Sequence, residues 1–227
     1  MRLFNKLTIV FLIISFIPLS SQAMSPIENL NSYSLKGKHN IQIGIGFLSD
    51  IGVRNRVSSS GVINTVEADG FLGSFTYNYW TRQKLAVSVS GGSLSSKVSN
   101  SATVSGVLNE VSSVVPILFG FKYQPFKLTN DEVLRPYILA SFGPFIGSSV
   151  KSQSGLKVEN GVFSETALGA HLGVAIDCSI SKLFVIGVGA GHYFVSDFDR
   201  SIGGETNYSS PEFSLSIGIL LGKGKVE

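Results

Sequence analysis

The feature that most constrains this chain is an alternation of apolar with small or polar residues, repeated in segments of about ten residues. In the first segment, Ile41, Ile43 and Ile45 alternate with Gln42 and Gly44. Successive side chains of a β-strand point to opposite faces, so this pattern is typical of a strand with one apolar face. Eight segments of this kind are expected, at about 39–48, 70–80, 84–92, 113–124, 135–146, 166–177, 182–194 and 212–222. In the fifth of them the phase of the alternation is ambiguous.

Hydropathy and charge indicate what surrounds these strands. Apolar residues make up 44% of the chain and charged residues only 15%, against a usual charged share of about 25%. After the N-terminal region, no segment is apolar over the roughly 18 residues that a membrane helix needs, whereas each alternating segment can cross a bilayer as a tilted strand. The sequence therefore predicts an all-β fold, an eight-stranded antiparallel up-and-down transmembrane β-barrel with its apolar side toward lipid.

The connections between the segments alternate in length. Residues 49–69, 93–112, 147–165 and 195–211 form long, polar connections rich in Ser, Gly and Asn, while 81–83 and 178–181 are tight and 125–134 is intermediate. Bacterial outer-membrane barrels have short periplasmic turns and long external loops. This pattern predicts that both ends of the barrel sequence lie in the periplasm.

Aromatic residues supply a second test of the membrane prediction. Barrels in membranes carry aromatic girdles at both interfaces. The predicted external girdle consists of Phe47, Phe71, Phe145, Phe194 and Phe213, and the periplasmic girdle of Tyr79, Trp80, Tyr123, Tyr137 and Phe184. A soluble β-sandwich, the alternative fold, explains neither the girdles nor the alternation of connection lengths.

The N-terminal residues have the pattern of a secretory signal peptide. Arg2 and Lys6 precede the apolar run 7–19, and Ser21-Gln22-Ala23 has the small-x-small pattern of a cleavage site. An uncleaved membrane anchor is the alternative. We expect residues 1–23 to be the signal peptide, 24–38 an N-terminal periplasmic segment, 39–222 the outer-membrane barrel and 223–227 a C-terminal tail.

Two stretches resemble a known group of proteins. The run from Val115-Pro116-Ile117 to Phe121-Lys122-Tyr123, followed by Arg135-Pro136-Tyr137 and Gly143, resembles the fourth and fifth strands of small outer-membrane barrels of the OmpW-like, OmpX/Ail-like and OmpA-type groups. The resemblance implies an eight-stranded bacterial outer-membrane barrel. Members of these groups usually end on an aromatic residue in the last strand, whereas this chain continues past Leu221 to Glu227.

The non-lipid face of the strands defines a predicted lumen that is poor in large side chains. Its main polar members are Gln42, Asn78, Lys122, His171 and Asp177, which we expect to form a polar network. Since a buried charge needs a partner, Lys122 and Asp177 are predicted to pair near the periplasmic end. The many small residues have two explanations. They could allow tight strand curvature, or leave a narrow cavity for a small or apolar molecule, as the resemblance to OmpW-like barrels suggests.

No catalytic, cofactor or metal site is expected. His192, Ser196, Asp197 and Asp199 lie near the external end of the seventh segment, but nucleophilic catalysis needs a serine within reach of an oriented base. The spacing of His192 and Ser196 also differs from the tight His-x-Ser pattern of the lipid A deacylases that share this architecture. The glycines of 187–191 lie within a strand that no helix follows, so they are not a dinucleotide-binding motif.

Three functions remain open. The first is a non-enzymatic outer-membrane barrel with a structural or surface-interaction role through its external loops. The second is a narrow conduit or binder for small or apolar solutes, and the third is a lipid A-modifying enzyme. The expected partners are outer-membrane lipids and lipopolysaccharide, the barrel-assembly machinery, and a surface ligand bound through the loops. Nucleic acid is not expected, because residues 24–227 hold 16 basic and 15 acidic residues and no basic run.

Overall fold

The computed structural model describes residues 34–48, 63–68, 71–103, 106–126, 133–155, 159–203 and 205–222, so the predicted signal peptide and C-terminal tail lie outside the described residues. Its elements are ten β-strands: β1 (His39–Leu48), β2 (Ile63–Ala68), β3 (Phe71–Arg82), β4 (Leu85–Ser93), β5 (Ser95–Thr103), β6 (Gly106–Tyr123), β7 (Leu134–Gly155), β8 (Glu159–Ser179), β9 (Phe184–Val195) and β10 (Ser210–Leu221). Within these ranges no helix is both long and apolar enough to cross a membrane.

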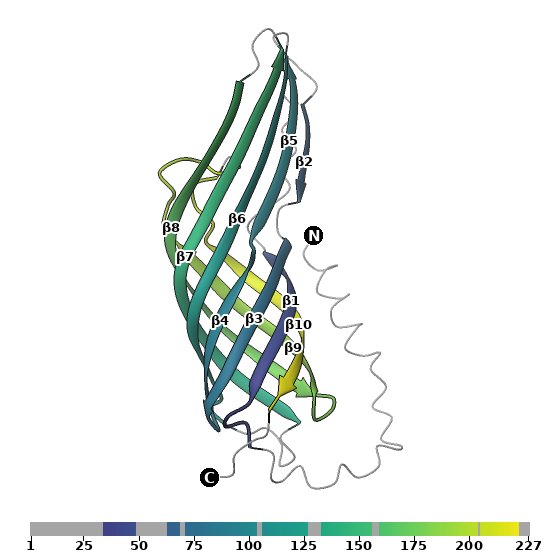
Figure 1. Ribbon diagram of the computed structural model, residues 1–227, viewed down its shortest axis with the longest axis vertical. Helices are drawn as coiled ribbons and strands as arrows, with labels where there is room; N and C mark the ends of the chain where they lie inside the picture. Colours follow the sequence, from purple (N-terminus) through teal and green to yellow (C-terminus); the bar gives the residue numbers. More distant parts are fainter. Residues whose placement is uncertain are drawn as a thin grey trace, which may run out of the picture. The chain divides into compact units, whose positions relative to one another are not determined.

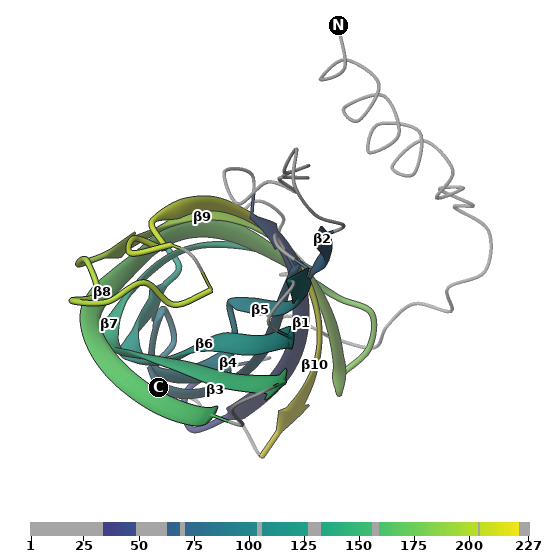
Figure 2. The same ribbon diagram turned by 90° about the horizontal axis from the view of Figure 1, so that it is seen from above.

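Eight of the strands form a closed barrel. Neighbours pair in the order β6-β4-β3-β1-β10-β9-β8-β7, and β7 pairs back onto β6. Every pairing is antiparallel. Figure 2 shows the resulting ring of strands seen from one end. The predicted eight-stranded antiparallel barrel is confirmed, and it has no unpaired strand edge where the ring closes.

The barrel is extended at one end by a sheet that the sequence did not predict. β5 pairs with the first half of β6, and β2 pairs with β5. β6, β7 and β8 contain 18, 22 and 21 residues and remain paired beyond the barrel. We call β2, β5 and residues 106–114, 147–155 and 159–166 the extended sheet (Figure 1).

The extended sheet corrects the prediction that residues 49–69, 93–112 and 147–165 are long, polar loops, because parts of all three segments form strands. These segments are rich in Ser, Gly and Asn, which have low strand propensity. The pairing of β7 with β6 nevertheless continues the barrel register without a shift, from Val115↔Ile146 through Val111↔Val150 to Gly106↔Gly155. The length of these strands is therefore determined by backbone pairing that continues from the barrel, and not by the strand propensity of their own residues.

The alternation places apolar side chains on the outer surface of the barrel. Ile43 is 67% exposed, Leu168 69% and Ile217 63%, although all three are large apolar residues within strands. Gln42, Gly44 and Gly46 of β1 point inward and are buried. An exposed apolar surface that runs around a molecule is far larger than the patches found on monomeric soluble proteins. The outer face is therefore suited to lipid rather than to water.

β7, whose phase was ambiguous, turns its odd-numbered residues inward. As a result Tyr137 and Phe145 are buried, and so is Trp80 of β3. The prediction that these three belong to the girdles was wrong, because each has the parity of the lumen-facing residues on its strand. Six other predicted girdle residues are exposed on the outer face, namely Phe47, Tyr79, Tyr123, Phe184, Phe194 and Phe213. The side chain of Phe71 lies outside the described part of the structure.

Apolar clusters fill both ends of the barrel interior. At the end with short turns, Leu35 and Trp80 pack with Ala86, Val185 and Leu220. At the opposite end, the segment between β9 and β10 turns inward over the ring (Figure 2). Its buried residues Phe198, Ile202 and Tyr208 pack against barrel residues that include Leu48, Leu72, Leu118 and Phe145. We call this inward-folded part of residues 196–209 the plug.

Two contacts fix the plug. The hydroxyl of Tyr208 donates a hydrogen bond to the Ile202 carbonyl oxygen. Gly147 of β7 leaves the space that Ile202 occupies, since a Cβ at this glycine would lie 2.7 Å from Ile202 Cγ1. The plug is thus packed into the barrel mouth as part of its core.

Candidate functional site

A cavity of about 100 Å³ lies inside the barrel. Its wall includes Gln42, Asn78 and Lys122, and also His171 and Glu212. Several small hydroxyl residues complete the wall, including Ser74, Ser88, Ser214 and Ser216. A polar cavity of this size has room for ordered water molecules, which would hydrogen-bond to the wall.

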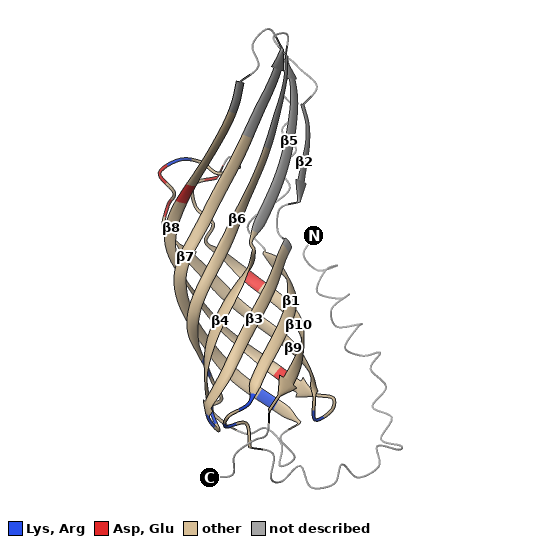
Figure 3. Ribbon diagram, in the orientation of Figure 1, with Lys and Arg blue, Asp and Glu red and all other residues tan. Residues whose placement is uncertain are grey.

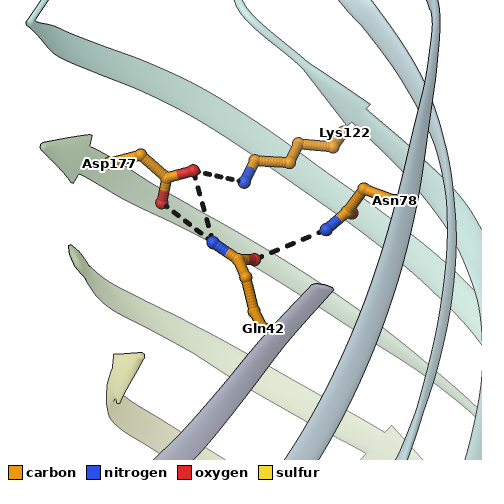
Figure 4. Close-up of polar contacts among 4 residues, drawn as sticks. All are labelled: Gln42, Asn78, Lys122 and Asp177. Atoms are coloured by element: carbon orange, nitrogen blue, oxygen red, sulfur yellow. Dashed lines mark hydrogen bonds and ion pairs between the residues drawn. The ribbon is translucent and has the colours of Figure 1, made fainter. Parts of the chain in front are cut away.

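Four of the five predicted network residues form one cluster (Figure 4). Lys122 Nζ of β6 lies 2.7 Å from Asp177 Oδ2 of β8, and the lysine side chain is only 2% exposed. Gln42 Nε2 of β1 lies 3.4 Å from both carboxylate oxygens of Asp177. Asn78 Nδ2 of β3 lies 3.4 Å from Gln42 Oε1. The cluster therefore connects four strands across the lumen.

Aromatic side chains surround the Lys122 ammonium. Its Nζ lies 3.5 Å from the centre of the Tyr137 ring and 6.0 Å from that of Trp80. A cation over an aromatic face is attracted to the ring electrons, and more strongly when water is excluded. The Tyr137 hydroxyl also donates to Asp177. The buried charge pair is thus supported by further contacts, as buried ions require.

His171 lies in a second cluster on the same cavity wall. Its Nε2 lies 2.9 Å from Glu212 Oε2 of β10, in an ion-pair contact where the ring N–H is not aimed squarely at the oxygen. The imidazole stacks on the Tyr193 ring with 4.3 Å between ring centres. Glu212 also accepts hydrogen bonds from the hydroxyls of Tyr193 and Ser214. Among the described residues, no hydrogen bond or ion pair joins His171 to Lys122 or Asp177, so the predicted network divides into two clusters.

Glycines of β9 make room for these side chains. A Cβ at Gly187 would lie 2.7 Å from Asp177 Oδ1, and a Cβ at Gly191 would collide with the His171 ring. Gly187 and Gly191 therefore lack a side chain where Asp177 and His171 of the neighbouring strand β8 lie, whereas Gly189 is paired with Ala175. Sequence reasoning noted these glycines but not their complementarity to Asp177 and His171.

Three site residues were missed by the sequence analysis. On β10, Glu212 lies an even number of residues from Ser214 and Ser216, so it shares their lumen-facing side of the strand. On β9, Tyr193 lies an even number of residues from the glycines and shares their side. These parities were a usable signal for both residues. Tyr137 could not be assigned, because the phase of β7 was ambiguous in the sequence.

The residues weighed for catalysis have other contacts. Ser196 Oγ accepts the Leu168 backbone N–H at 3.1 Å, and Asp197 Oδ1 accepts from Asn207 Nδ2 at 2.6 Å. Among the described residues, no hydrogen bond joins His192 to Ser196. His192 instead lies against the Phe194 ring with 4.4 Å between ring centres. No group of three or more His, Cys, Asp or Glu within the described ranges is placed to hold a metal ion.

Comparison with known proteins shows likeness in structure alone. No protein-family model and no curated protein sequence matched the chain. The solved structures that it is similar to include Ail of Yersinia pestis, with 15% identity, a TM-score of 0.46 and coverage of 82% of this chain and 99% of that one. OprG of Pseudomonas aeruginosa has 10% identity, a TM-score of 0.44 and coverage of 83% and 97%. Neisserial surface protein A has 11% identity, a TM-score of 0.43 and coverage of 82% and 99%.

Proposed function

We propose that this chain is a non-catalytic barrel of the bacterial outer membrane that acts through the surface it presents outside the cell. The observation that carries the proposal is a closed barrel with an apolar outer face, from one end of which the extended sheet projects. A closed barrel satisfies all backbone hydrogen bonds between strands, which is what a lipid environment demands. Residues above the apolar face are then free to meet the exterior.

The orientation follows from the connections. The described short turns, 83–84 and 180–183, lie at one end of the barrel, and the extended sheet and plug lie at the other. In outer-membrane barrels the short turns face the periplasm. In this scheme residues 1–23 act as a cleaved signal peptide, 24–38 precede the barrel in the periplasm, 39–222 form the barrel, and 223–227 form a tail. The proposed partners are outer-membrane lipids, lipopolysaccharide, the assembly machinery and a ligand of the external surface.

The interior supports a structural role for the lumen. Lys122 lies against Asp177 and His171 against Glu212, and apolar side chains fill both ends. A catalytic site would instead need access to substrate, and the plug covers the external side of the cavity. A surface role places the working residues on the extended sheet and the plug, outside the bilayer.

Labelling from outside the cell tests the orientation. The chain has one cysteine, so Cys178→Ser gives a background without thiols. We expect a membrane-impermeant maleimide to label Val162→Cys in intact cells, since Val162 is 75% exposed near the extended sheet. Lys182→Cys, in a short turn, should react only after lysis. Labelling of Lys182→Cys alone in intact cells would contradict the proposed orientation.

Trimming the extended sheet tests the function. A variant in which short turns replace residues 96–112 and 149–163 is expected to keep a barrel that resists detergent until boiled. Cells that carry it should adhere to surfaces no better than cells without the protein. If cells with the trimmed variant adhere as well as cells with the wild type, and the variant keeps its heat-dependent gel shift, a surface-interaction role is contradicted. Stabilisation of the envelope would then be the remaining function.

The cavity gives a specific reason to test the conduit alternative. Because apolar clusters close the lumen at both ends, we expect the wild-type protein to show no conductance steps in planar lipid bilayers. Replacing the plug residues Phe198, Ile202 and Tyr208 with serine would open only the external end. Regular conductance steps from the unmodified protein would show that the plug moves and would favour the conduit.

A further inference from the structure

Among the side chains that the structure describes outside the lumen, the charges differ in sign between the two ends of the barrel. At the end with short turns the described charges outside the lumen are all basic, namely Lys36, Arg82, Lys84 and Lys182. At the other end the described charged side chains outside the lumen are mainly acidic: Glu165, Asp197, Asp199 and Glu205, with Arg200 beside Glu165. Figure 3 shows most of the blue at the turn end, where some red also lies, and most of the red toward the opposite end.

This separation does not come from an overall surplus of charge. Residues 24–227 contain 16 basic and 15 acidic residues. We call the basic side chains of Lys36, Arg82, Lys84 and Lys182 the basic rim. The rim is distributed around the barrel, because its residues precede β1, connect β3 to β4 and connect β8 to β9.

The basic rim lies directly beyond the apolar face. Lys182 comes two residues before Phe184, and Arg82 three residues after Tyr79, and both aromatic side chains are exposed on the outer face. At about 3.3 Å per residue along a strand, these cations lie within roughly 10 Å of the aromatic girdle. That is the depth at which the phosphate groups of the surrounding leaflet must lie.

Positive charge at the end with short turns also affects the buried residue Lys38. Lys38, immediately before β1, has its pKa lowered from 10.5 to about 8, first by burial and second by the charge of Arg135. Lys38 and Arg135 are both buried, so they add positive charge behind the basic rim and are not part of it.

We propose that the basic rim binds anionic phospholipid headgroups of the periplasmic leaflet, in preference to zwitterionic ones. The inference rests on the outer-membrane placement proposed above. Arginine and lysine donors match phosphate oxygens, and a basic residue near an anionic lipid surface gains about fivefold in binding. An acidic protein would be expected to meet a patch on one side of the barrel. Cations around the circumference instead fit the leaflet that encloses it.

Two side chains next to the rim residues, Thr81 and Ser181, make hydrogen bonds to the backbone of the turns. Thr81 Oγ1 donates to the Leu85 carbonyl, and Ser181 Oγ accepts the N–H groups of Leu183 and Phe184. Replacing Arg82, Lys84 and Lys182 with glutamine therefore removes three charges while these turn contacts remain.

The test measures which lipids stay bound to the barrel. The full chain is inserted into vesicles of phosphatidylethanolamine and phosphatidylglycerol at three to one, extracted with a nanodisc-forming polymer, and its lipids are quantified by mass spectrometry. The wild type should carry phosphatidylglycerol at about twice its bulk fraction or more. The variant R82Q/K84Q/K182Q should return to the bulk fraction. The matched control K97Q/K151Q/R200Q, which removes three charges from the other end, should keep the enrichment.

Two results would overturn the inference: a wild-type fraction equal to the bulk, or equal loss of enrichment in the matched control. If the rim variant fails to insert, the wild-type protein is tested alone at two salt concentrations. Enrichment of phosphatidylglycerol by surface charge must fall as salt rises from about 0.1 M to 1 M. Enrichment that stays the same at both concentrations would contradict binding by the basic rim. A wild-type chain that gives no heat-dependent gel shift in the vesicles would instead overturn the membrane placement itself.

Discussion

Replacing Gly120 with valine is expected to prevent the barrel from closing. Gly120 lies in β6 opposite Ser141 of β7, at the pairing that joins the two ends of the sheet. A Cβ at this position would collide with the Ala140 carbonyl oxygen and would lie 2.5 Å from Ser141 Cβ. Because the collision involves backbone, no change of side-chain rotamer relieves it. We expect no detergent-resistant species on unboiled gels, and protein that accumulates unfolded.

Gly73 provides the matched control. It also lies in a barrel strand, β3, but a Cβ there would meet no atom within 4 Å. Gly73→Val should therefore give the same heat-dependent gel shift as the wild type. If Gly120→Val closes normally, the close approach of β6 and β7 is wrong. If both variants fail, glycine is needed in these strands for a reason other than contact.

The contacts of the lumen glycines test the two explanations of the small lumen residues, tight strand curvature and a narrow cavity. Gly120 and also Gly143, whose Cβ would collide with the Ile117 carbonyl oxygen, are required by close approach of backbones. Gly187 and Gly191 instead accommodate Asp177 and His171. A cavity is present as well. Both explanations thus apply, at different glycines, and the sequence could not separate them because composition does not distinguish backbone from side-chain contact.

The fold was largely predictable because alternation is a local property. Each strand of the barrel except β7 has the phase expected from its own residues, and closure follows once eight such strands must avoid free edges. The phase of β7 was not predictable, because Tyr137 and Phe145 are apolar enough for either face. The extended sheet was missed because its strands are stabilised by pairing with neighbours, which no local pattern reveals.

The candidate site was predictable only in part. Lys122 and Asp177 were identified because charges on lumen positions are rare and need partners. The partner of His171 was not identified: Glu212 has the parity of the lumen residues Ser214 and Ser216, but it is the first residue of the predicted last strand and was not assigned to the lumen. The plug could not be foreseen, since its loop is rich in polar residues and only Phe198, Ile202 and Tyr208 turn inward.

Replacing Lys122 with methionine is expected to lower the free energy of unfolding by about 3–5 kcal/mol, the usual cost of leaving one member of a buried ion pair without its partner. Methionine is close to lysine in length, so packing against Tyr137 is largely kept while the Asp177 carboxylate loses its cation at 2.7 Å. Urea titration of the protein in lipid vesicles measures the change. Trp80, the only tryptophan, lies near Lys122 Nζ and reports unfolding by its fluorescence.

Two further variants separate the pair from other causes. Lys84→Met removes an exposed lysine at the same end and should change the free energy of unfolding by less than about 0.5 kcal/mol. The double variant K122M/D177N removes both charges but leaves an oxygen that can accept hydrogen bonds from Gln42 and Tyr137. It should recover most of the stability, because what destabilises the single variant is an uncompensated buried charge. If the double variant is as unstable as Lys122→Met, the lysine acts through packing against the aromatic rings, and the ion pair contributes little to holding the four strands together.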